Sequence, residues 1–466
     1  MPGQCVINSE ITVAAGVFAP GHLGELTQVI DFDLVDAVLA ETGRTQKRVR
    51  LLPARVVVYF VLALALFASC GYRRVWAKLG SGLAPLALAA PGSSALTQAR
   101  RRVGAKPLRR LFEVLAGPVA RPGTPGAFWR GLRTVIIDGT LLAVPDDAAV
   151  TGRYGKRSGA TLSWGYPQAR LLALVECGTR AILAATFGPE IGNGTGEKSY
   201  ARDLVGGLRA DMLLLADAGF DSAALLAQIT ATGARFLVRS GASRRPLILR
   251  VLSDGSYLAV LPHRDGPLAV RMVEAWVTVT LADGRARTEP WRLVTNLLDH
   301  HRYPATDLIA LYHQRWEIET AIRSIKSTIL DGRVLRSHRP DDIDQEVHAL
   351  LCVYQAIIRI AVDAADSVPG LDPDRISFTV ICETARNQVI NAHGVIPTQI
   401  ELVGQIGRAA LAHLLPPRRQ RTKTRCRKVA TSKYSPKAGW SPATQPYTLD
   451  TKIAIFEEPL TARRKP

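Results

Sequence analysis

Three carboxylates occupy positions in the sequence that favour metal-ion chemistry. Asp138 interrupts the apolar run VIIDG, Asp217 ends the apolar run MLLLAD, and Glu319 lies within the helical stretch 311–330. A carboxylate within or at the end of a buried strand is costly unless it is paired or binds a cation. Oxygen ligands of this kind suit Mg²⁺, and two such ions about 4 Å apart activate a water or a 3′-hydroxyl and stabilise the leaving oxygen of a phosphodiester. We therefore expect Asp138, Asp217 and Glu319 to converge as catalytic metal ligands.

The stretch 311–330, LYHQRWEIETAIRSIKSTIL, threads charges through an apolar helix. At about 100° per residue, four polar side chains fall within about 40° of the line through Glu319: Tyr312, Arg315, Arg323 and Lys326. A neighbouring apolar stripe forms the expected core face: Leu311, Ile318, Ile322, Ile325 and Ile329. The charges are therefore segregated on one edge beside the core. An ordinary surface helix with ion pairs between residues four apart explains the same pattern, so the helix alone leaves both interpretations open.

Other carboxylates fit a metal site less well. Asp146 and Asp147 follow Pro145 and are typical of a turn. Asp203 and Asp211 lie on or after a helix, without strand context. Glu317 points away from the edge that carries Glu319, and we expect it to be a solvent-exposed partner.

The elements that must position the two aspartates follow the order of an α/β fold. Three β-rich segments come first, at 134–144, 169–176 and 180–188, with the last two joined around Gly178. They are followed by a helix in KSYARDLVGGL, the strand that ends on Asp217, a helix with Asp221 as N-cap and a strand in ARFLVRSG. Three antiparallel strands followed by alternating helices and strands are the order of a ribonuclease H-like core.

Composition changes along the chain predict five segments. These are a helical N-terminal DNA-binding region at 1–130, the first part of the core at 131–242, an all-β insertion at 243–303, the second part of the core with C-terminal helices at 304–415, and a basic tail at 416–466. The insertion has two hairpin-like stretches with Asp-Gly turns at Asp254 and Asp283. Residues 118–129 are rich in Pro and Gly and are expected to be a linker. Residues 416–433 have eight basic residues and no acidic one, so we expect a flexible tail that adds non-specific DNA affinity.

The charge balance indicates a polyanionic partner. The chain of 466 residues has 59 Lys and Arg against 40 Asp and Glu, a formal net charge of +19. A surplus of this size attracts polyanions, of which nucleic acid is the commonest, although a generally basic protein has the same composition. Two basic clusters lie in the N-terminal region, one at 44–55 and one at 100–110 that includes Arg100, Arg101 and Arg102. One such cluster alone is equally typical of a solvated helix face, but the repetition favours phosphate contact.

Cysteine spacing and hydropathy favour the cytoplasm. The six cysteines lie far apart with no Cys-x-x-Cys pair, which argues against a zinc knuckle or a disulfide framework and favours a reducing compartment. The longest apolar run, Val56–Ala68, has 13 residues (68−56+1), whereas a bilayer-spanning helix needs about 20. We expect a buried helix there, no membrane partner, and no secretory signal at the N-terminus.

The spacing Tyr312-x-x-Arg315-x-x-x-Glu319-x-x-x-x-x-x-Lys326 matches the Y-R-E-K signature of the bacterial insertion-sequence-four family of DDE transposases. The blocks Asp138-Gly-Thr and Asp217-Ala-Gly-Phe resemble those around the first and second aspartates of that family. The intervals are 79 residues (217−138) and 102 residues (319−217), and the longer one suits the β insertion that the family places before its glutamate helix. The resemblance covers roughly residues 130–365 and, more loosely, the basic N-terminal region.

This resemblance implies a function and a set of residue roles. The chain would be a DNA transposase that cuts transposon ends and joins them to a target, with Asp138, Asp217 and Glu319 holding two Mg²⁺ ions that Mn²⁺ can replace. The other residues of the charged edge would hold phosphates of the DNA end: Tyr312, Arg315, Arg323 and Lys326. The enzyme would act as a homodimer on double-stranded DNA, at terminal inverted repeats and target DNA, in the bacterial cytoplasm and associated with the nucleoid.

In several relatives the freed 3′-hydroxyl attacks the opposite strand to form a hairpin, which water then reopens. That route needs a flipped base near the transposon end, and an aromatic platform to receive the base. Trp291, 21 residues before Tyr312 (312−291), is the expected platform by its place in the family layout. Trp316 and Trp276 are alternatives, although Trp276 is more simply explained as a core residue of its hairpin.

Three other functions fit parts of the pattern. A catalytically silent, transposase-derived DNA-binding protein would keep the basic surface, but an intact triad argues against it. A metal-dependent nuclease of the same fold would cut DNA without transferring strands. A recombinase with a tyrosine nucleophile is disfavoured because no His-x-x-Arg occurs in the chain.

Overall fold

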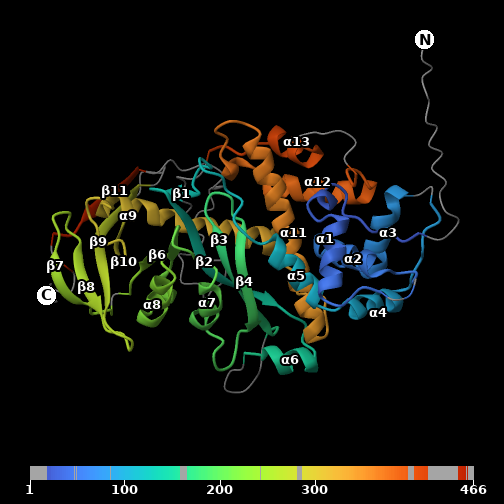
Figure 1. Cartoon of the computed structure of the whole chain (residues 1–466), viewed down its shortest axis with the longest axis horizontal. Coiled ribbons are helices and arrows are strands. Elements are labelled where there is room, and N and C mark those ends of the chain that lie inside the picture. The colour runs from blue at the N-terminus through green and yellow to red at the C-terminus, as the bar shows by residue number, and fades with distance from the viewer. Residues whose placement is uncertain are drawn as a thin grey trace, which may run out of the picture.

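The computed structural model describes residues 18–46, 48, 50–83, 86–157, 165–241, 243–280, 286–396, 403–417, 450–457 and 459. A cluster of helices forms one end of the molecule, and a long twisted sheet with helices on its faces forms the other (Figure 1).

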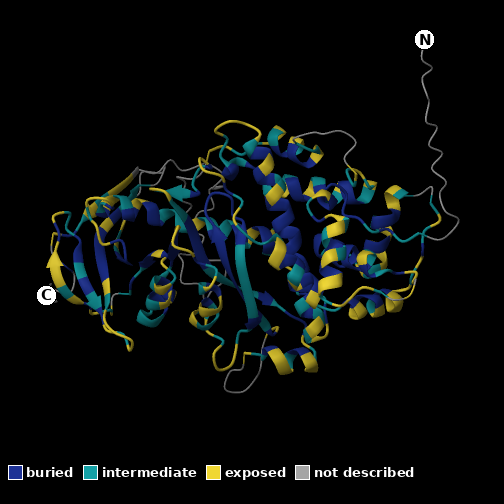
Figure 2. Cartoon of the chain, in the orientation of Figure 1, coloured by how far each residue is buried: buried dark blue, intermediate teal, exposed yellow. Residues whose placement is uncertain are grey.

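Short helices form the N-terminal region and pack on the helices of the C-terminal region. The N-terminal set is α1 Phe32–Glu41, α2 Ala54–Leu66, α3 Tyr72–Gly80, α4 Ser93–Val103 and α5 Lys106–Leu115. The C-terminal set is α11 Pro340–Asp366, α12 Phe378–Asn391 and α13 Gln405–Ala412. Helix α2 contains most of the predicted apolar run and is buried against α11, which confirms it as a core helix (Figure 2). The apolar cores of the two sets are continuous.

Helix α11 is long and apolar enough to cross a bilayer, judged by length and composition alone. In the structure, 78% of its most apolar 18-residue window is buried inside the protein. It contacts α2, α5, α12 and α13, which are the helices that cover it. Its apolar surface is therefore explained by its place in the centre of the fold.

One mixed sheet passes through the rest of the molecule, with the order β4-β3-β2-β5-β6-β10-β9-β8-β7, β1 paired with β2, and β11 paired with β9. The strands are β1 Phe128–Trp129, β2 Leu132–Ala143, β3 Gln168–Glu176, β4 Ile182–Pro189, β5 Met212–Ala216, β6 Arg235–Arg239, β7 Leu247–Val251, β8 Tyr257–Leu261, β9 Leu268–Thr280, β10 Ala286–Thr295 and β11 Asp450–Ile455. Strands β2, β3 and β4 are antiparallel neighbours, whereas β5 and β6 join β2 in parallel. The predicted ribonuclease H-like order is confirmed.

Helices cover both faces of this sheet. Helices α7 Glu197–Val205 and α8 Ala223–Ala231 pack on one face. Helices α9 Ala305–Tyr312 and α10 Glu317–Arg323 pack with α11 on the other, and the short helix α6 Ala148–Tyr154 contacts α11 and β4. Because side chains alternate along a strand, Ile136 belongs to the core with α10 and α11, whereas Val135 and Ile137 belong to the core with α7 and α8.

The all-β insertion continues the core sheet. Its strands β7 to β10 are antiparallel, and β10 pairs with β6 so that Thr295 lies opposite Leu237. The Asp254-Gly255 turn lies between β7 and β8 as predicted, and the turn at Asp283 lies outside the described residues. The Asp254 carboxylate pairs with the buried Arg271 and accepts a 3.0 Å hydrogen bond from the Ala305 amide. The first turn of the insertion is thereby tied to the start of α9, the helix that leads to Glu319.

Several local predictions were wrong. Helix α8 has Ser222 at the N-cap position, because the Asp221 carboxylate instead accepts hydrogen bonds from Ser240 and Arg244. By contrast, the expected linker 118–129 does join α5 to β2, and the carboxylate of Glu176 accepts hydrogen bonds from the amides of its second and third residues. The predicted basic tail forms β11 at 450–455, while 418–449 lie outside the described residues.

Candidate functional site

Asp138 and Asp217 lie at the same level of two neighbouring parallel strands. Strands β2 and β5 pair with Ile136 opposite Leu215, and each aspartate follows two residues later. Strand β5 ends at Ala216, so Asp217 is the first residue beyond its carboxyl end. Burial raises the pKa of Asp138 to about 6; a hydrogen bond from the Gly139 amide opposes the shift, and the negative charge of Asp217 adds to it. The structure thus brings the two predicted aspartates together.

The turn after Asp217 holds that carboxylate in place. Its Oδ1 accepts a 2.7 Å hydrogen bond from the Gly219 amide and caps the 3₁₀ turn Ala218–Phe220. A Cβ at residue 219 would lie 2.8 Å from the same oxygen, closer than side chains tolerate. Glycine at this position therefore lets the backbone approach the carboxylate.

The segment that carries Glu319 follows one helical path with three kinds of winding. Helix α9 ends at Tyr312, a 3₁₀ turn covers His313–Trp316, α10 covers Glu317–Arg323, and a π-helix covers Ser324–Ile329. The prediction of one uniform α-helix was wrong, because 3₁₀ and π turns rotate each residue by different angles. The predicted core stripe is largely confirmed, with these residues buried: Leu311, Ile318, Ile325 and Ile329.

Tyr312 links this segment to the strand that ends at Asp217. Its ring is 3% exposed, and its hydroxyl donates a 3.0 Å hydrogen bond to the carbonyl of Ala216. Burial raises the pKa of Tyr312 to about 12, so the hydroxyl remains a donor at neutral pH. A contact between Tyr312 and a phosphate would require the hydroxyl to exchange the Ala216 carbonyl for the phosphate.

The basic residues of the segment differ in their exposure. The Arg315 guanidinium lies 5.8 Å from the centre of the Tyr312 ring, and its positive charge lowers the pKa of Asp138. Arg323 is exposed, whereas Lys326 is half-buried, and burial lowers its pKa. Of these three side chains, that of Arg315 thus acts electrostatically on Asp138.

Glu319 is partly buried on α10, which packs against β2. Within the part of the chain that the structure describes, no three His, Cys, Asp or Glu side chains are grouped closely enough to hold a metal ion. Asp138 and Asp217 thus follow paired residues of β2 and β5, Glu319 lies on α10 next to β2, and the described side chains do not form a closed ligand cage.

Glu317 has a structural contact that the sequence did not indicate. Its Oε2 accepts a 2.8 Å hydrogen bond from the Gly178 amide, in the turn between β3 and β4. Gly178 has a φ of +83°, and a Cβ there would lie 2.6 Å from the carbonyl oxygen of Pro125. Glu317 thus anchors a tight turn, and the prediction of a solvent-exposed partner was wrong.

Glu197, the first residue of α7, is a carboxylate at the site that the sequence analysis missed. Its Oε1 lies 3.2 Å from where a Cβ of Gly139 would be, and its Oε2 lies 3.7 Å from where a Cβ of Gly219 would be. Arg170 on β3 donates a 2.7 Å hydrogen bond to Oε1. The only sequence signal is an acidic residue at the start of the first helix after the three strands, which by itself does not place it beside Asp138 and Asp217.

The three candidate tryptophans lie in different surroundings. Trp291 on β10 is partly buried, meets the Tyr312 ring edge-on at 5.5 Å, and lies 5.3 Å below the Arg239 guanidinium. Trp276 on β9 is 41% exposed and contacts Phe456, so the expectation that it is a core residue of the hairpin was wrong. Trp316 is 37% exposed beside Arg315. Of the three, Trp291 is the one in contact with Tyr312.

Arg100 does not face solvent. It is 2% exposed, and its guanidinium donates hydrogen bonds to Gln345, Tyr72 and Ser337 and to the carbonyl of Asp342. The prediction that Arg100 contacts DNA was therefore wrong: this arginine joins α4 to the start of α11. Arg101, next to it, is about half exposed and lies 3.4 Å from the Asp342 carboxylate.

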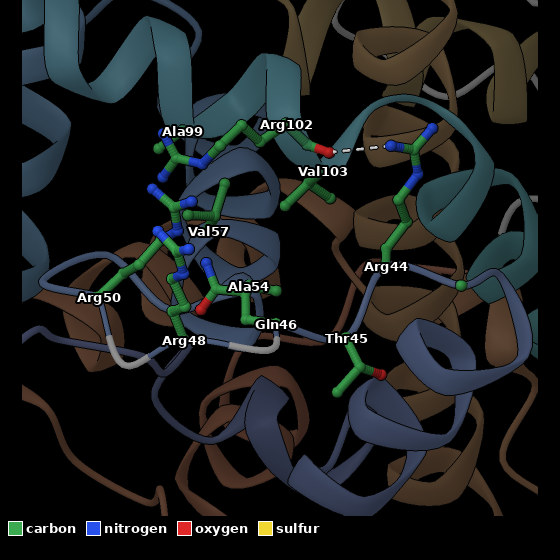
Figure 3. A pocket seen from close by; sticks show the side chains of 11 residues that line it. Arg44, Thr45, Gln46, Arg48, Arg50, Ala54, Val57, Ala99, Arg102 and Val103 are labelled. Atoms are coloured by element: carbon green, nitrogen blue, oxygen red, sulfur yellow. Dashed lines mark hydrogen bonds between the residues drawn. The ribbon is translucent and has the colours of Figure 1, made fainter.

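Arg102 instead lines a basic cleft of about 300 Å³ between α4 and the segment that precedes α2. The guanidinium groups of Arg48, Arg50 and Arg102 point toward one another, and Arg44 donates a 3.3 Å hydrogen bond to the Arg102 carbonyl (Figure 3). Desolvation and the positive charge of Arg50 lower the pKa of Arg102. None of the described residues that line the cleft is acidic. We call these four residues, Arg44, Arg48, Arg50 and Arg102, the arginine cleft.

The chain is similar to known proteins over most of its length. Residues 20–113 match the family model for the N-terminal region of the insertion element 4 transposase, and residues 129–356 match that of the transposase DDE domain. The chain is 28% identical to transposase InsG of insertion sequence element IS4 from Escherichia coli K12, over 88% of this chain and 93% of that protein. It is 36% identical to the putative transposase InsZ of the same organism over 21% of this chain and 32% of InsZ. A piggyBac transposase synaptic complex with hairpin DNA superposes with a TM-score of 0.42 at 11% identity, over 84% of each chain. The chain belongs to the IS4 family of DDE transposases, enzymes that cleave DNA and transfer its strands.

Proposed function

We propose that Asp138, Asp217 and Glu319 are the catalytic triad of this transposase and the ligands of its divalent ions, with Mg²⁺ as the ion and Mn²⁺ as a substitute. The observation that supports this most strongly is the pairing of β2 with β5, which sets the two aspartates side by side. The donor set suits such an ion, because oxygen ligands are what Mg²⁺ prefers. The raised pKa of Asp138 indicates that the two carboxylates repel each other in a poorly solvated place, which a cation would relieve.

Glu319 would complete the ligand set by a local change of the helix. Helix α10 has only seven residues and lies between a 3₁₀ turn and a π-helix. If either the 3₁₀ turn or the π-helix converted to α-helix, the side chains of α10 would rotate about the helix axis. Ions bound by the three residues would activate a water or a 3′-hydroxyl and stabilise the leaving oxygen of the phosphodiester.

The basic residues around the site would hold the DNA end. Arg323 is exposed and Lys326 half-buried on the turns that follow Glu319, which suits contact with phosphates. Arg315 lies deeper, where it faces Asp138, so it would bind the phosphate nearest the reacting bond. Tyr312 would act mainly on the Asp217 turn through its bond to Ala216.

The arginine cleft would bind the backbone of the same DNA end farther from the cut. Convergent guanidinium groups repel one another, and a phosphate that bridges them removes this repulsion. Arg101 and Arg102 thus remain candidate DNA contacts, and Arg44, Arg48 and Arg50 join them.

Several family properties belong to the same proposal. The enzyme would act as a homodimer on terminal inverted repeats and target DNA, in the cytoplasm and on the nucleoid. A hairpin route is supported by the place of Trp291 beside Tyr312, where a flipped base could stack.

A cleavage assay tests the triad. DNA that carries the terminal inverted repeats flanking the gene is incubated with Mg²⁺ and the parent, Asp138→Asn, Asp217→Asn or Glu319→Gln. We expect the parent to cut and each variant to lose nearly all activity; variants that cut as fast as the parent would refute the triad. A parent that binds but does not cut indicates a silent copy. Joining of pre-cleaved ends to a target then separates a transposase from a nuclease of the same fold.

A further inference from the structure

Glu197 lies close to the two backbone segments that carry the aspartates, the strand β2 at Gly139 and the turn after Asp217. Gly139 directly follows Asp138, and Gly219 is two residues after Asp217. One oxygen of the Glu197 carboxylate is 3.2 Å from the Cβ position of Gly139, and the other is 3.7 Å from that of Gly219. The carboxylate therefore lies between these two backbone segments.

The absence of side chains at Gly139 and Gly219 makes this approach possible. Strand β5 ends at Ala216, whereas β2 continues to Ala143, so residue 139 has no β5 residue beside it. The Glu197 carboxylate, at the start of α7, approaches the backbone of β2 at this residue. A side chain at residue 139 would press on the Glu197 carboxylate and on Leu172.

Arg170 holds the Glu197 carboxylate from behind. Its side chain is 16% exposed and lies between two glutamates, 2.7 Å from Glu197 and 3.9 Å from Glu190. Glu190 also pairs with Arg157, whereas Glu197 is 36% exposed and is turned toward the aspartates. A surface ion pair alone explains the bond to Arg170, but it does not explain why the carboxylate lies close to both Gly139 and Gly219.

We propose that Glu197 is a fourth carboxylate of the divalent-ion site, positioned by Arg170, which strengthens binding of the ion without being one of the three essential residues. This inference rests on the proposed triad of Asp138, Asp217 and Glu319. Its physical basis is that Mg²⁺ and Mn²⁺ keep waters in protein sites, and a nearby carboxylate accepts hydrogen bonds from those waters and adds negative charge. Partners of this kind typically change metal affinity by about 10–100-fold.

Titration of the full chain with Mn²⁺ in the absence of DNA, with free Mn²⁺ followed by electron paramagnetic resonance, tests the inference. We expect Glu197→Gln to raise the Kd for Mn²⁺ about 10-fold. Glu190→Gln removes the other carboxylate beside Arg170 and should leave the Kd within about two-fold, since the Glu190 carboxylate is paired with Arg157. Glu197→Asp keeps the charge on a shorter side chain and should give an intermediate Kd. The thermal midpoint without metal checks that each variant is folded.

Cleavage gives a second readout that a purely structural role would not reproduce. For Glu197→Gln, the Mn²⁺ concentration that gives half-maximal cleavage should rise about 10-fold, whereas for Glu190→Gln it should stay within about two-fold of the parent. Asp138→Asn should lose both binding and maximal rate.

The outcomes separate this inference from the proposed triad. If Glu197→Gln binds Mn²⁺ like the parent while Asp138→Asn does not, Glu197 has no role at the ion and the triad stands. If Glu190→Gln weakens binding as much as Glu197→Gln, the effect is one of overall charge, and the inference is wrong. If Asp138→Asn binds Mn²⁺ like the parent, the proposed metal site itself is wrong.

Discussion

The hydroxyl of Tyr312 donates a 3.0 Å hydrogen bond to the carbonyl of Ala216, the residue directly before Asp217. This bond joins the first residue of the signature segment to the end of β5, 96 positions earlier in the chain. Trp291 of the insertion meets the same tyrosine ring edge-on at 5.5 Å. Three distant parts of the sequence therefore meet at Tyr312, which lies between the candidate catalytic aspartate and the candidate base platform.

Replacement of Tyr312 by Phe should slow cleavage. The change keeps the ring and removes the donor, which leaves a buried carbonyl unpaired at a cost of about 1–3 kcal/mol. Loss of the bond to Ala216 should also displace the neighbouring Asp217. We therefore expect the cleavage rate at saturating Mg²⁺ to fall about ten-fold, equivalent to about 1.4 kcal/mol in the activation free energy. Single-turnover cleavage of end DNA measures the effect.

Tyr59→Phe is the matched control for Tyr312→Phe. Tyr59 is also buried, and its hydroxyl donates a 2.7 Å hydrogen bond to the carbonyl of Ile30, in the N-terminal helices. Both variants should lower the thermal midpoint to a similar degree, but only Tyr312→Phe should slow cleavage. Equal rates for the two variants would contradict a positioning role for Tyr312.

Metal binding should depend on pH through Asp138. The pKa of this carboxyl is raised to about 6, so the group is mostly protonated below that pH and must lose its proton before it can bind an ion. The Mn²⁺ affinity should rise by up to about ten-fold per pH unit from pH 5 to 6 and change little above pH 7. Mn²⁺ titrations of the parent at several pH values between 5 and 8 measure this, and an affinity that stays constant between pH 5 and 6 would contradict the prediction.

The same raised pKa predicts the opposite trend for stability without metal. A carboxyl whose pKa is higher in the folded than in the unfolded chain contributes stability at low pH, and this contribution is lost as the pH rises through the folded value. The metal-free parent should therefore lose stability, relative to Asp138→Asn, between pH 5 and 7. A thermal midpoint difference between the two proteins that does not change over this range would indicate an ordinary pKa for Asp138.

The sequence predicted the parts of the site that local pattern determines. A charge inside an apolar strand is conspicuous, so Asp138 and Asp217 were found together with the strands that carry them. The winding of residues 313–329 was missed, because helix propensity does not determine it, and the π-helix is packed against α11 and α12, which lie later in the chain. The place of Glu197 at the site was missed, and Arg100 was wrongly expected to contact DNA, for a related reason. Their decisive contacts are with residues far away in sequence: Gly139 for Glu197, and Ser337 and Gln345 for Arg100.

Loss of Arg102 should weaken binding of end DNA and flatten its salt dependence. Each phosphate contact that is removed lowers the slope of log K against log salt by about 1. We expect Arg102→Ala to do this because its guanidinium converges with Arg48 and Arg50 in the arginine cleft. Fluorescence anisotropy with end DNA at several salt concentrations provides the slope.

Two other arginines provide the comparison for Arg102→Ala. Arg109 on α5 is 70% exposed and paired with Glu113, so Arg109→Ala should leave the slope unchanged. Arg100→Ala should lower the thermal midpoint, because it leaves buried partners such as Gln345 and Ser337 without their donor. If Arg109→Ala changes the slope as much as Arg102→Ala, binding depends on overall charge and not on the cleft.

Replacement of Trp291 by Ala should affect a step after the first strand is cut. Stacking of a base on an aromatic side chain is worth about 1–3 kcal/mol, so loss of the platform should slow hairpin formation about 10- to 100-fold. Nicking of the first strand should change less, because Trp291 contacts Tyr312 and not the aspartates.

Trp276→Ala serves as the control, since Trp276 is 41% exposed and contacts Phe456 at the β9–β11 edge of the sheet. Denaturing gels that resolve nicked, hairpin and reopened ends follow each step. Equal slowing of nicking and hairpin formation by Trp291→Ala would mean that Trp291 supports Tyr312 and does not receive a base.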